Sequence, residues 1–544
     1  MQAKAIMVQG TGSDVGKSIL VCALCRIFQQ EGLKVAPFKA QNMSNNSYIT
    51  MDGKEMGRAQ VAQAEAAGLR PSVEMNPILL KPTGNNGSQV ITMGRPLRHM
   101  TAGEYYQNKN MMLDIAKQAY ARLIGQYDII VIEGAGSPSE INLKDSDIVN
   151  MKIAETADAP VLLVTDIERG GAFAWVVGTL ELLDSDERER VCGVIINKFR
   201  GDMKILQSGV NMLENRIDKP VLGVIPYFND IKIDDEDSVC LENNGYKSQF
   251  VNSGNSKPEK APIDIVVVRL PRISNFTDFD ILKREKDVRL RFVDNVKSFG
   301  KPDLIILPGT KNTIGDLKTI KENGIADIII NFAKEGTMVI GICGGYQMLG
   351  NEIIDPENAE SDISQINGLG LLNAITFFKP EKDTYQIKAR MYNHPPDQIV
   401  RQPDKAILAG TGNNIFNDIK CDMTGYEIHM GETKLLNGLS PFLRIIERSG
   451  KGISMVDGAV SNNGNVIGTY VHGILDNDEF RLGLINYLRK NKGISPLLRD
   501  ELITAKREKE EQYDRLADLV RKHLKMDMIY KLIGTDRSVV KSNV

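Results

Sequence analysis

Cysteine and tryptophan are scarce in this chain. Six cysteines and one tryptophan occur among 544 residues. The cysteines are scattered, which excludes the disulfide framework of small secreted domains. Cys22 and Cys25 form a C-x-x-C pair, but no second pair completes a zinc site. We therefore favour burial of both side chains in a helix over metal binding or redox chemistry.

The sequence also lacks a strong charge imbalance and a long hydrophobic run. The net charge is −3, which excludes the excess of basic residues that is typical of a nucleic-acid binder. No apolar run is long enough to cross a bilayer, and the N-terminal stretch MQAKAIMVQG is too short in apolar residues for a signal peptide. We expect a cytoplasmic protein with neither nucleic-acid nor membrane partners.

The length predicts more than one domain, because 544 residues exceed the usual size of a single core. In the first 230 residues, short apolar runs alternate with helical stretches such as 17–31 and 110–125. This alternation is typical of a doubly wound α/β sheet. The predicted strands are 5–8, 128–133, 160–166, 192–198 and 220–226.

A second α/β pattern follows a polar stretch. Residues 231–262 contain few strand signals, and we interpret them as a linker. The tail 491–544 is charged and strand-free, with helical spacing. The sequence thus predicts two doubly wound domains, 1–230 and 263–490, and a helical tail. Strands of the second domain are expected at 263–270, 303–309, 338–345, 368–378, 426–433 and 465–473.

The stretch GTGSDVGKS begins at Gly10, after a predicted strand and before a predicted helix. Gly10, Gly12 and Gly16 permit the tight backbone path that directs N–H groups toward phosphate oxygens. Lys17 adds a positive charge, and Ser18 adds a hydroxyl for Mg²⁺. The glycine spacing is one residue longer than that of the simplest phosphate loop. The strand before the stretch and the helix after it nevertheless favour a loop that binds the phosphates of ATP. The residues predicted to bind ATP are Gly10, Thr11, Gly12, Val15, Gly16, Lys17, Ser18 and, after a later strand, Asn197.

Two carboxylates end predicted strands in the same half. Glu133, in VIEGAGSP, is the expected second Mg²⁺ ligand, and the glycines that follow it allow a substrate to approach the backbone. Asp166 occupies a similar strand end, where metal, substrate and structural roles stay open. The predicted metal-binding set is Ser18, Glu133 and Asp166.

A candidate nucleophile lies in the second half, in VIGICGGYQMLG. Cys343 follows a strand signal and precedes two glycines and a helix, a turn that exposes a side chain above a sheet. The helix N-terminus favours the thiolate over a buried structural thiol. His472, in GTYVHGILDN, is the favoured proton shuttle, and His429 is its rival. Gly309 and Gly344 offer backbone N–H groups for an oxyanion.

The first half resembles the dethiobiotin synthetase-like amide ligases. The resemblance lies in GTGSDVGKS, PFKAQNMSNNS, KPTG and VIEGAGSP. It implies that ATP activates a carboxylate as an acyl phosphate, which nitrogen then attacks. The segment KAQNMSNNS narrows the resemblance to the cobyric acid synthase family.

The second half resembles a class I glutamine amidotransferase domain through LPGTKNT, GICGGYQMLG, YEIHMGET and GTYVHGI, in that order. The resemblance implies that Cys343 attacks the glutamine amide and that His472 protonates the departing ammonia. The usual glutamate two residues after the histidine is Ile474 here. The acid that would orient His472 therefore stays open. It could be Asp476 or another carboxylate, or the cysteine and the histidine could act without one.

Together the resemblances imply an ammonia-generating domain fused to an ATP-dependent carboxylate activator. They imply amidation of the b, d, e and g carboxylates of adenosylcobyrinic acid a,c-diamide, with ATP, Mg²⁺ and glutamine, in cobalamin biosynthesis. The alternatives are an a,c-diamide synthase, a ParA-like switch ATPase and a decayed scaffold. KAQNMSNNS and the tail disfavour the first, the cysteine domain disfavours the second, and the retained Cys343 and His472 disfavour the third. The sequence does not decide between a monomer and a homo-oligomer.

Overall fold

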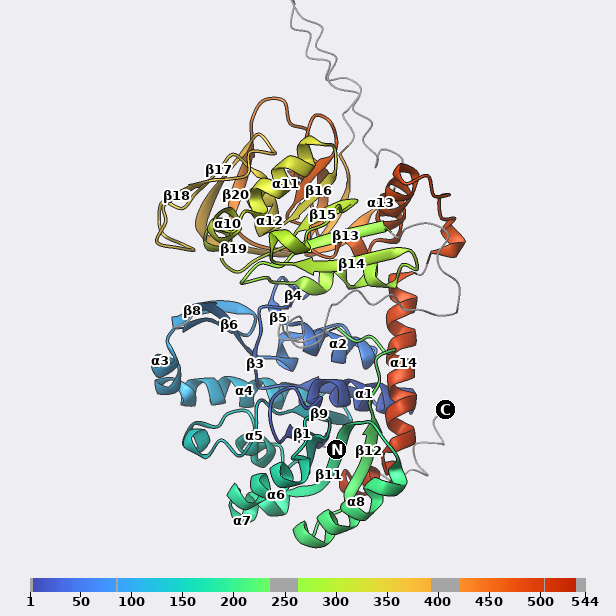
Figure 1. Ribbon diagram of the computed structural model, residues 1–544. Coiled ribbons are helices and arrows are strands. Elements are labelled where there is room, and N and C mark those ends of the chain that lie inside the picture. Colours follow the sequence, from blue (N-terminus) through green and yellow to red (C-terminus); the bar gives the residue numbers. More distant parts are fainter. Residues whose placement is uncertain (1–2, 85–86, 235–262, 393–420, 503, 535–544) are drawn as a thin grey trace, which may run out of the picture. The chain divides into compact units, whose positions relative to one another are not determined.

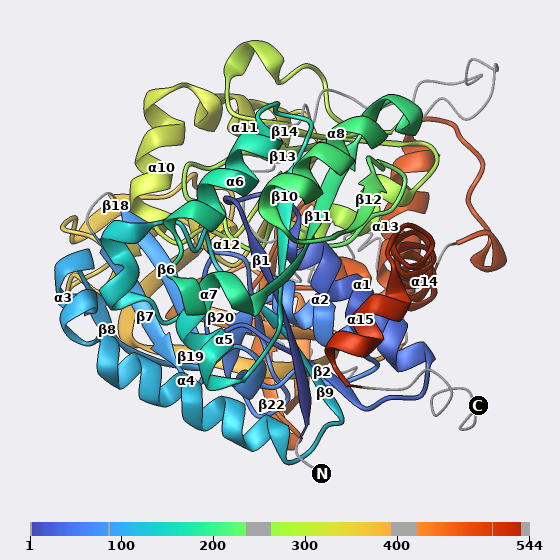
Figure 2. The same cartoon turned by 90° about the horizontal axis from the view of Figure 1, so that it is seen from below.

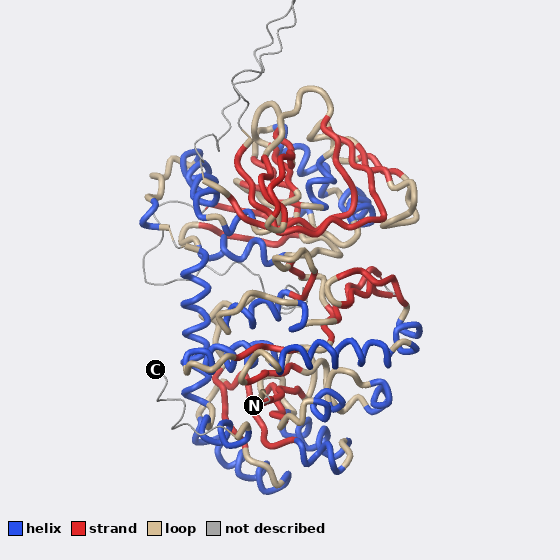
Figure 3. The backbone as a smooth tube through the Cα atoms, turned by 180° about the vertical axis from the view of Figure 1, so that it is seen from behind, coloured by secondary structure: helices blue, strands red, loops and turns tan. Residues whose placement is uncertain are grey.

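A computed structural model describes residues 3–84, 87–234, 263–392, 421–502 and 504–534 (Figure 1). The chain divides into two compact units. The first comprises Met1–Ser44, Glu55–Glu236 and Lys506–Val544, and the second comprises Asn45–Lys54 and Asp237–Ala505. In both units helices flank the strands (Figure 3). The α/β fold class predicted from the sequence is thereby confirmed. Most of the predicted linker, residues 235–262, lies outside the described residues.

The centre of the first unit is a parallel six-stranded sheet of order β12-β11-β10-β1-β9-β2. Its strands are β1 (Lys4–Gly10), β2 (Val35–Phe38), β9 (Ile129–Glu133), β10 (Val161–Asp166), β11 (Val191–Phe199) and β12 (Val221–Pro226). All the strands predicted for this half are present. The additional strand β2 lies at the sheet edge, where Pro37 is tolerated because its missing N–H faces away from the ladder.

Helices cover both faces of this sheet (Figure 2). On one face, Ile6 and Val8 of β1 join a core with α1, α2, α14 and α15. On the other face, right-handed crossovers place α4, α5, α6 and α8; Tyr120 of α4 meets Phe38 of β2 edge-on at 5.4 Å. The helices are α1 (Lys17–Gln30), α2 (Arg58–Ala66), α3 (Ala102–Gln107), α4 (Lys109–Ile124), α5 (Met151–Thr156), α6 (Ala172–Leu182), α7 (Ser185–Arg190), α8 (Met203–Ile217), α14 (Ala505–His523) and α15 (Met526–Leu532).

The C-terminal helices belong to the core of the first unit. Tyr513, Leu516 and Val520 of α14 are buried with the apolar face of α1, and α14 lies next to α1 and at a large angle to it in Figures 1 and 2. Arg26 of α1 pairs with Asp514 at 2.8 Å. Cys22 and Cys25 are buried in α1, as predicted, and burial raises the pKa of both thiols.

A small sheet of order β3-β6-β7-β8 completes the first unit. Its strands are β3 (Gln41–Met43), β6 (Ile78–Gly84), β7 (Gly87–Thr92) and β8 (Arg95–Met100), and β5 (Glu55–Gly57) lies before α2. Short 3₁₀ turns are η1 (Val73–Met75) and η2 (Ile141–Ser146). None of these strands is predicted from the sequence, because they are short or mix polar and apolar residues.

The second unit has a sheet of order β14-β13-β15-β16-β24-β23, parallel except for β23. Successive residues of β13 face two different cores: Ile265 and Val267 lie in one, and Val266 and Val268 in the other. The strands are β13 (Ile263–Val268), β14 (Val288–Val293), β15 (Leu304–Leu307), β16 (Met338–Ile342), β23 (Ala459–Val460) and β24 (Val466–Thr469). The helices are α10 (Thr313–Glu322), α11 (Ile325–Lys334), α12 (Gly344–Leu349) and α13 (Asp478–Asn491).

A second, mostly antiparallel sheet packs against one of these cores, where Ile387, Ala389 and Ile445 are buried. Its order is β18-β17-β19-β21-β22, with β20 paired to β19. The strands are β17 (Glu352–Ile354), β18 (Gln365–Asn367), β19 (Ala374–Met391), β20 (Met423–Leu435), β21 (Leu443–Arg448) and β22 (Lys451–Asp457); β4 is Ser47–Ile49. The 3₁₀ turns are η3 (Phe276–Arg284), η4 (Val296–Ser298), η5 (Ile474–Asp476) and η6 (Arg499–Glu501). Within the described ranges, no helix combines the length and apolar character needed to cross a membrane.

Candidate active sites

The predicted phosphate loop connects β1 to α1 in the first unit. Gly16, which precedes α1, has φ +100°, and a side chain there would meet the Asn197 amide at 2.1 Å. Only glycine fits this position without strain. Lys17 turns back over the loop: its Nζ donates to the carbonyls of Gly12 at 2.9 Å and Gly136 at 3.0 Å. A side chain at Gly12 would meet nothing within 4 Å, so the loop backbone is open there.

The Glu133 carboxylate lies beside Ser18 at the end of β9. Ser18 Oγ donates to Glu133 Oε1 at 2.7 Å, and Lys39 Nζ pairs with the same oxygen at 2.8 Å. Gln63 Nε2 donates to the other oxygen, Oε2, at 2.5 Å. Glu133 and Lys39 are both buried. The structure thus brings together two of the predicted metal-binding residues and surrounds their carboxylate with donors that the sequence analysis did not single out.

The other two strand-end residues lie across β1 from Glu133, since β10 and β11 follow β1 on that side of the sheet. Asp166 pairs with Lys198 Nζ at 3.0 Å and with Arg169 at 3.6 Å. Asn197 Nδ2 donates to the carbonyl of Val15 at 2.8 Å. Asp166 therefore lies apart from the predicted metal ligands Ser18 and Glu133. Asn197 supports the phosphate loop through its hydrogen bond to Val15.

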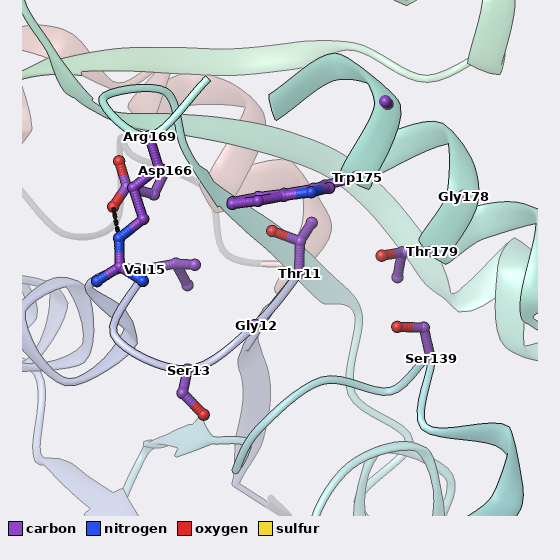
Figure 4. Close-up of a pocket in the computed structure, with 11 residues that line it drawn as sticks. Thr11, Gly12, Ser13, Val15, Ser139, Asp166, Arg169, Trp175, Gly178 and Thr179 are labelled. Atoms are coloured by element: carbon purple, nitrogen blue, oxygen red, sulfur yellow. Dashed lines mark ion pairs between the residues drawn. The ribbon is translucent and has the colours of Figure 1, made fainter. Parts of the chain in front are cut away.

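A cavity of about 440 Å³ opens beside the loop. Figure 4 shows Trp175 reaching over it next to Thr11, with the Asp166–Arg169 pair at its edge. Thr11 is fixed by its N–H, which donates to Val164 at 2.9 Å, and by its hydroxyl, which donates to Thr165 at 3.2 Å. The lining residues are Thr11, Gly12, Ser13, Val15, Ser139, Asp166, Arg169, Ala174, Trp175, Gly178 and Thr179.

Cys343 occupies a sharp turn between β16 and α12 in the second unit. Its φ of +53° and ψ of −111° are rare for a residue with a side chain and mark stored backbone strain. The neighbouring glycines make the turn sterically feasible: a side chain at Gly345 would lie 2.0 Å from the Leu307 carbonyl, and one at Gly344 2.9 Å from Thr310. The thiol lies 3.4 Å from the Ile428 carbonyl oxygen.

His472 lies next to Cys343, and its partner is a carboxylate that sequence reasoning missed. His472 Nδ1 is 2.7 Å from Asp278 Oδ2, and both side chains are buried. Asp278 is on η3, 194 residues earlier in the chain. Burial alone would lower the pKa of His472, but the Asp278 carboxylate and the hydrogen bond with Cys343 raise it to about 10. His472 is therefore an imidazolium at neutral pH, set between a carboxylate and a thiol.

Asp278, rather than the neighbouring Asp476, is thus the carboxylate that is hydrogen-bonded to His472. No sequence signal identified Asp278, since it lies in an ordinary stretch, SNFTDFDIL. A hydrogen bond between segments so far apart becomes visible only when the chain is folded.

The rival histidine, His429, has a different environment. Burial lowers its pKa to about 3, so the ring is neutral. It stacks on Tyr470 with ring centroids 3.8 Å apart, and its Nδ1 is 3.1 Å from the Gly431 carbonyl. In the described part of the chain its Nε2 has no hydrogen-bond partner. His429 lacks the carboxylate that charges His472.

A buried polar network continues from the nucleophile turn along α12. Gln347 Nε2 donates to the Met430 carbonyl at 3.0 Å, and its Oε1 accepts from Thr313 Oγ1 at 3.1 Å. Thr313 also contacts the Glu360 carboxylate at 3.1 Å. Burial raises the pKa of Glu360 to about 7. The network fixes α12 and hence the turn that carries Cys343.

The two predicted oxyanion-hole glycines border the same turn. Gly344 begins α12, so its N–H has no carbonyl one turn earlier in the helix. A side chain at Gly309 would lie 3.0 Å from the His472 ring, so this residue must be small. A thiol, a charged imidazole and helix-initial N–H groups together form the kind of arrangement used for acyl transfer at a carbonyl.

Two family models match the chain, one over each half. A family described as the CobQ/CobB/MinD/ParA nucleotide binding domain matches residues 6–239. A family described as the CobB/CobQ-like glutamine amidotransferase domain matches residues 264–480.

Curated relatives match almost the whole chain. The cobyric acid synthase of Caldanaerobacter subterraneus subsp. tengcongensis is 49% identical over 531 residues, covering 98% of this chain and 99% of the relative. That of Pelotomaculum thermopropionicum is 50% identical over 537 residues, covering 98% and 97%. That of Moorella thermoacetica is 48% identical over 539 residues, covering 99% of each. With a nucleotide-binding domain followed by a glutamine amidotransferase domain, the chain belongs to the cobyric acid synthase family.

Proposed function

We propose that this chain is an ATP- and glutamine-dependent amide ligase that amidates the b, d, e and g carboxylates of adenosylcobyrinic acid a,c-diamide in cobalamin biosynthesis. The observation that carries the proposal is the presence, in one chain, of a Cys343–His472–Asp278 set and a Lys17–Ser18–Glu133 set. Family membership supports the corrinoid substrate.

In the second unit, Cys343 attacks the side-chain amide of glutamine. The N–H groups of Gly309 and Gly344 stabilise the oxyanion of the tetrahedral intermediate. His472 donates its proton to the departing nitrogen, and ammonia leaves as the thioester forms. Water, deprotonated by the now neutral His472, then hydrolyses the thioester to glutamate. Asp278 keeps the imidazole oriented throughout and stabilises its protonated form.

In the first unit, the loop N–H groups and Lys17 bind the phosphates of ATP. Lys17 Nζ now contacts the Gly12 and Gly136 carbonyls, which phosphate oxygens would replace as its partners. A substrate carboxylate attacks the γ-phosphorus and releases ADP. Ammonia then attacks the acyl phosphate, so that the amide forms and inorganic phosphate leaves. The backbone of Gly10, Thr11, Val15 and Gly16 shapes the loop, and Asn197 supports it through Val15.

The residues present fit a Mg²⁺ ion at Ser18 and Glu133. Mg²⁺ prefers oxygen ligands and is usually bound by one or two carboxylates together with substrate phosphates, and here a hydroxyl and a carboxylate meet beside the loop. The ion would neutralise charge on the phosphates. Lys39 Nζ now contacts the same carboxylate oxygen, and the ion would replace that contact. Asp166 is paired with Lys198. We propose that it fixes the side chains at the edge of the cavity and is not a ligand of the ion beside Ser18 and Glu133.

Mass spectrometry of the corrinoid product tests the proposal. The full-length protein is incubated with ATP, Mg²⁺, adenosylcobyrinic acid a,c-diamide and glutamine labelled with ¹⁵N in its amide. We expect one labelled amide at each of the b, d, e and g positions and one glutamate released per amide. A parallel incubation supplies cobyrinic acid in place of the a,c-diamide, and amidation at a and c there, with no product from the a,c-diamide, would indicate the sister reaction. ATP hydrolysis without labelled product would contradict the ligase.

A further inference from the structure

A short segment from the N-terminal half of the sequence forms part of the second unit. Residues 45–54 group with that unit, whereas Ser44 and Glu55 on either side group with the first. Within the segment, Ser47 and Ile49 are fully buried. Ile49 forms a small apolar cluster with residues of β20. The segment is therefore packed into the amidotransferase unit and is not a loose connection.

Tyr426 of β20 links this segment to His472. The Tyr426 ring lies 5.2 Å from the imidazole, with the planes 15° apart. The main chains of these two residues also exchange hydrogen bonds of 2.9 and 3.2 Å. At its other end, the Tyr426 hydroxyl donates to the Ser47 carbonyl at 3.3 Å and accepts from Asn275 Nδ2 at 2.8 Å. The Tyr48 ring lies 5.2 Å from that of Tyr426.

The segment also contacts the turn η3, which carries the carboxylate partner of His472. Asn275 directly precedes η3 with φ +52°. Its side chain brackets the main chain of Ser47, with Nδ2 donating to the carbonyl at 3.1 Å and Oδ1 accepting from the N–H at 3.4 Å. Thr277 Oγ1 donates to Asn46 Oδ1 at 3.2 Å. The imidazole is thus flanked by the Tyr426 ring and the Asp278 carboxylate. The segment 45–54 contacts both Tyr426 and the turn η3 that carries Asp278.

We propose that residues 45–54 are a positioning element of the glutaminase site, acting on His472 through Tyr426 and η3. The proposal rests on the amidotransferase chemistry proposed above. A proton shuttle must lie within hydrogen-bond reach of its partner, and a misplacement of about 1 Å can cost about 10²-fold in rate. Hydrolysis of glutamine therefore depends on a segment encoded within the nucleotide-binding half of the sequence.

Full-length variants at the ends of this chain of contacts test the proposal. Tyr426→Phe removes the hydroxyl but keeps the ring, and Tyr48→Leu removes the ring that the segment places against Tyr426. We expect each to lower kcat for glutamine hydrolysis about tenfold, with KM changed less than about twofold. Alkylation of Cys343 by iodoacetamide at pH 7 should slow in parallel, because the reactivity of a cysteine depends on a correctly placed imidazolium beside it.

Two matched variants serve as controls. Tyr48→Phe keeps the ring and should restore kcat. Thr384→Val removes the 2.8 Å hydrogen bond to Gly53 at the far end of the segment and should leave kcat unchanged. Amidation supported by free ammonia should stay at the wild-type rate in all variants.

Unchanged glutamine hydrolysis and alkylation in Tyr426→Phe and Tyr48→Leu would overturn the positioning role. So would an equal loss of ammonia-dependent amidation, since that would indicate damage to the whole protein. If the wild-type protein amidates no corrinoid with either nitrogen source, the proposed function fails instead. The alkylation rates still test the positioning role in that case.

Discussion

The charge on His472 depends on one residue, Asp278. The two side chains are buried within 2.7 Å of each other, where burial alone would favour a neutral imidazole. The carboxylate reverses that preference and, together with the contact to Cys343, raises the pKa of His472 to about 10. An imidazolium beside a cysteine increases the reactivity of that cysteine.

We therefore expect Asp278→Asn to lower glutamine hydrolysis about 10²-fold or more, a typical loss for a misoriented general acid–base. Without the carboxylate the pKa of His472 falls, so the imidazolium is lost at a lower pH than in the wild type. The pH profile of Cys343 alkylation by iodoacetamide measures this change: alkylation at pH 7 should slow in the variant.

The matched control for this substitution is Asp476→Asn, which alters the carboxylate closest to His472 in sequence. It should keep hydrolysis within about twofold of wild type, because the carboxylate hydrogen-bonded to His472 Nδ1 is that of Asp278. A larger loss in Asp476→Asn than in Asp278→Asn would contradict the assignment of the carboxylate partner.

At the scale of elements, the turn between β16 and α12 depends on close backbone approach. Gly345 is the tightest point, because a side chain there would lie 2.0 Å from the Leu307 carbonyl of β15. A backbone carbonyl in a central strand cannot move aside as a flexible side chain would. The glycine therefore allows α12 to begin directly above the sheet and Cys343 to project from the turn.

Gly345→Ala should destabilise the second unit by about 1–3 kcal/mol, the usual cost of overpacking, and should reduce glutamine hydrolysis. Calorimetric unfolding of the full-length protein measures the first effect. Gly452→Ala on β22, where a side chain would meet nothing within 4 Å, is the matched control and should change stability by less than about 0.5 kcal/mol. Equal unfolding temperatures for Gly345→Ala and wild type would show that the turn can relax.

The strands that a sequence pattern can predict are those buried on both faces. β1, β9, β10 and β16 are continuous apolar runs, and such runs are typical of central parallel strands. β14 was not predicted because its sequence, VRLRFV, alternates charged and apolar residues over only six positions. The small sheet of β3, β6, β7 and β8 was not predicted for a similar reason.

Packing between distant segments is harder to predict than the elements themselves. The stretch KAQNMSNNS indicated a family, but its polar composition gave no sign that Ser47 would be buried beside Tyr426. The helical spacing of the tail predicted α14. Its place in the core of the first unit follows from contacts such as Arg26–Asp514, nearly 500 residues apart in sequence.

At the scale of the whole molecule, the proposed reaction releases one nitrogen atom in one unit and consumes it in the other. The residues proposed for the two chemistries are separate: Cys343 and His472 lie in the second unit, and Lys17 and Glu133 lie in the first. Substitutions in the two sets should therefore give different patterns of loss when the nitrogen source is changed. This difference separates a ligase from two unrelated activities that share one chain.

Cys343→Ala should abolish amidation supported by glutamine, because the thioester cannot form, and should retain amidation supported by free ammonia and ATP. Lys17→Ala should eliminate amidation from either source, since the loop loses the cation that binds the phosphates of ATP. Amide formation measured by mass spectrometry with each donor distinguishes the variants. Loss of both reactions in a folded Cys343→Ala protein would place the thiol in the activation step. Full turnover of Lys17→Ala would remove the phosphate loop from the mechanism, leaving the acyl phosphate without a binding site for its donor.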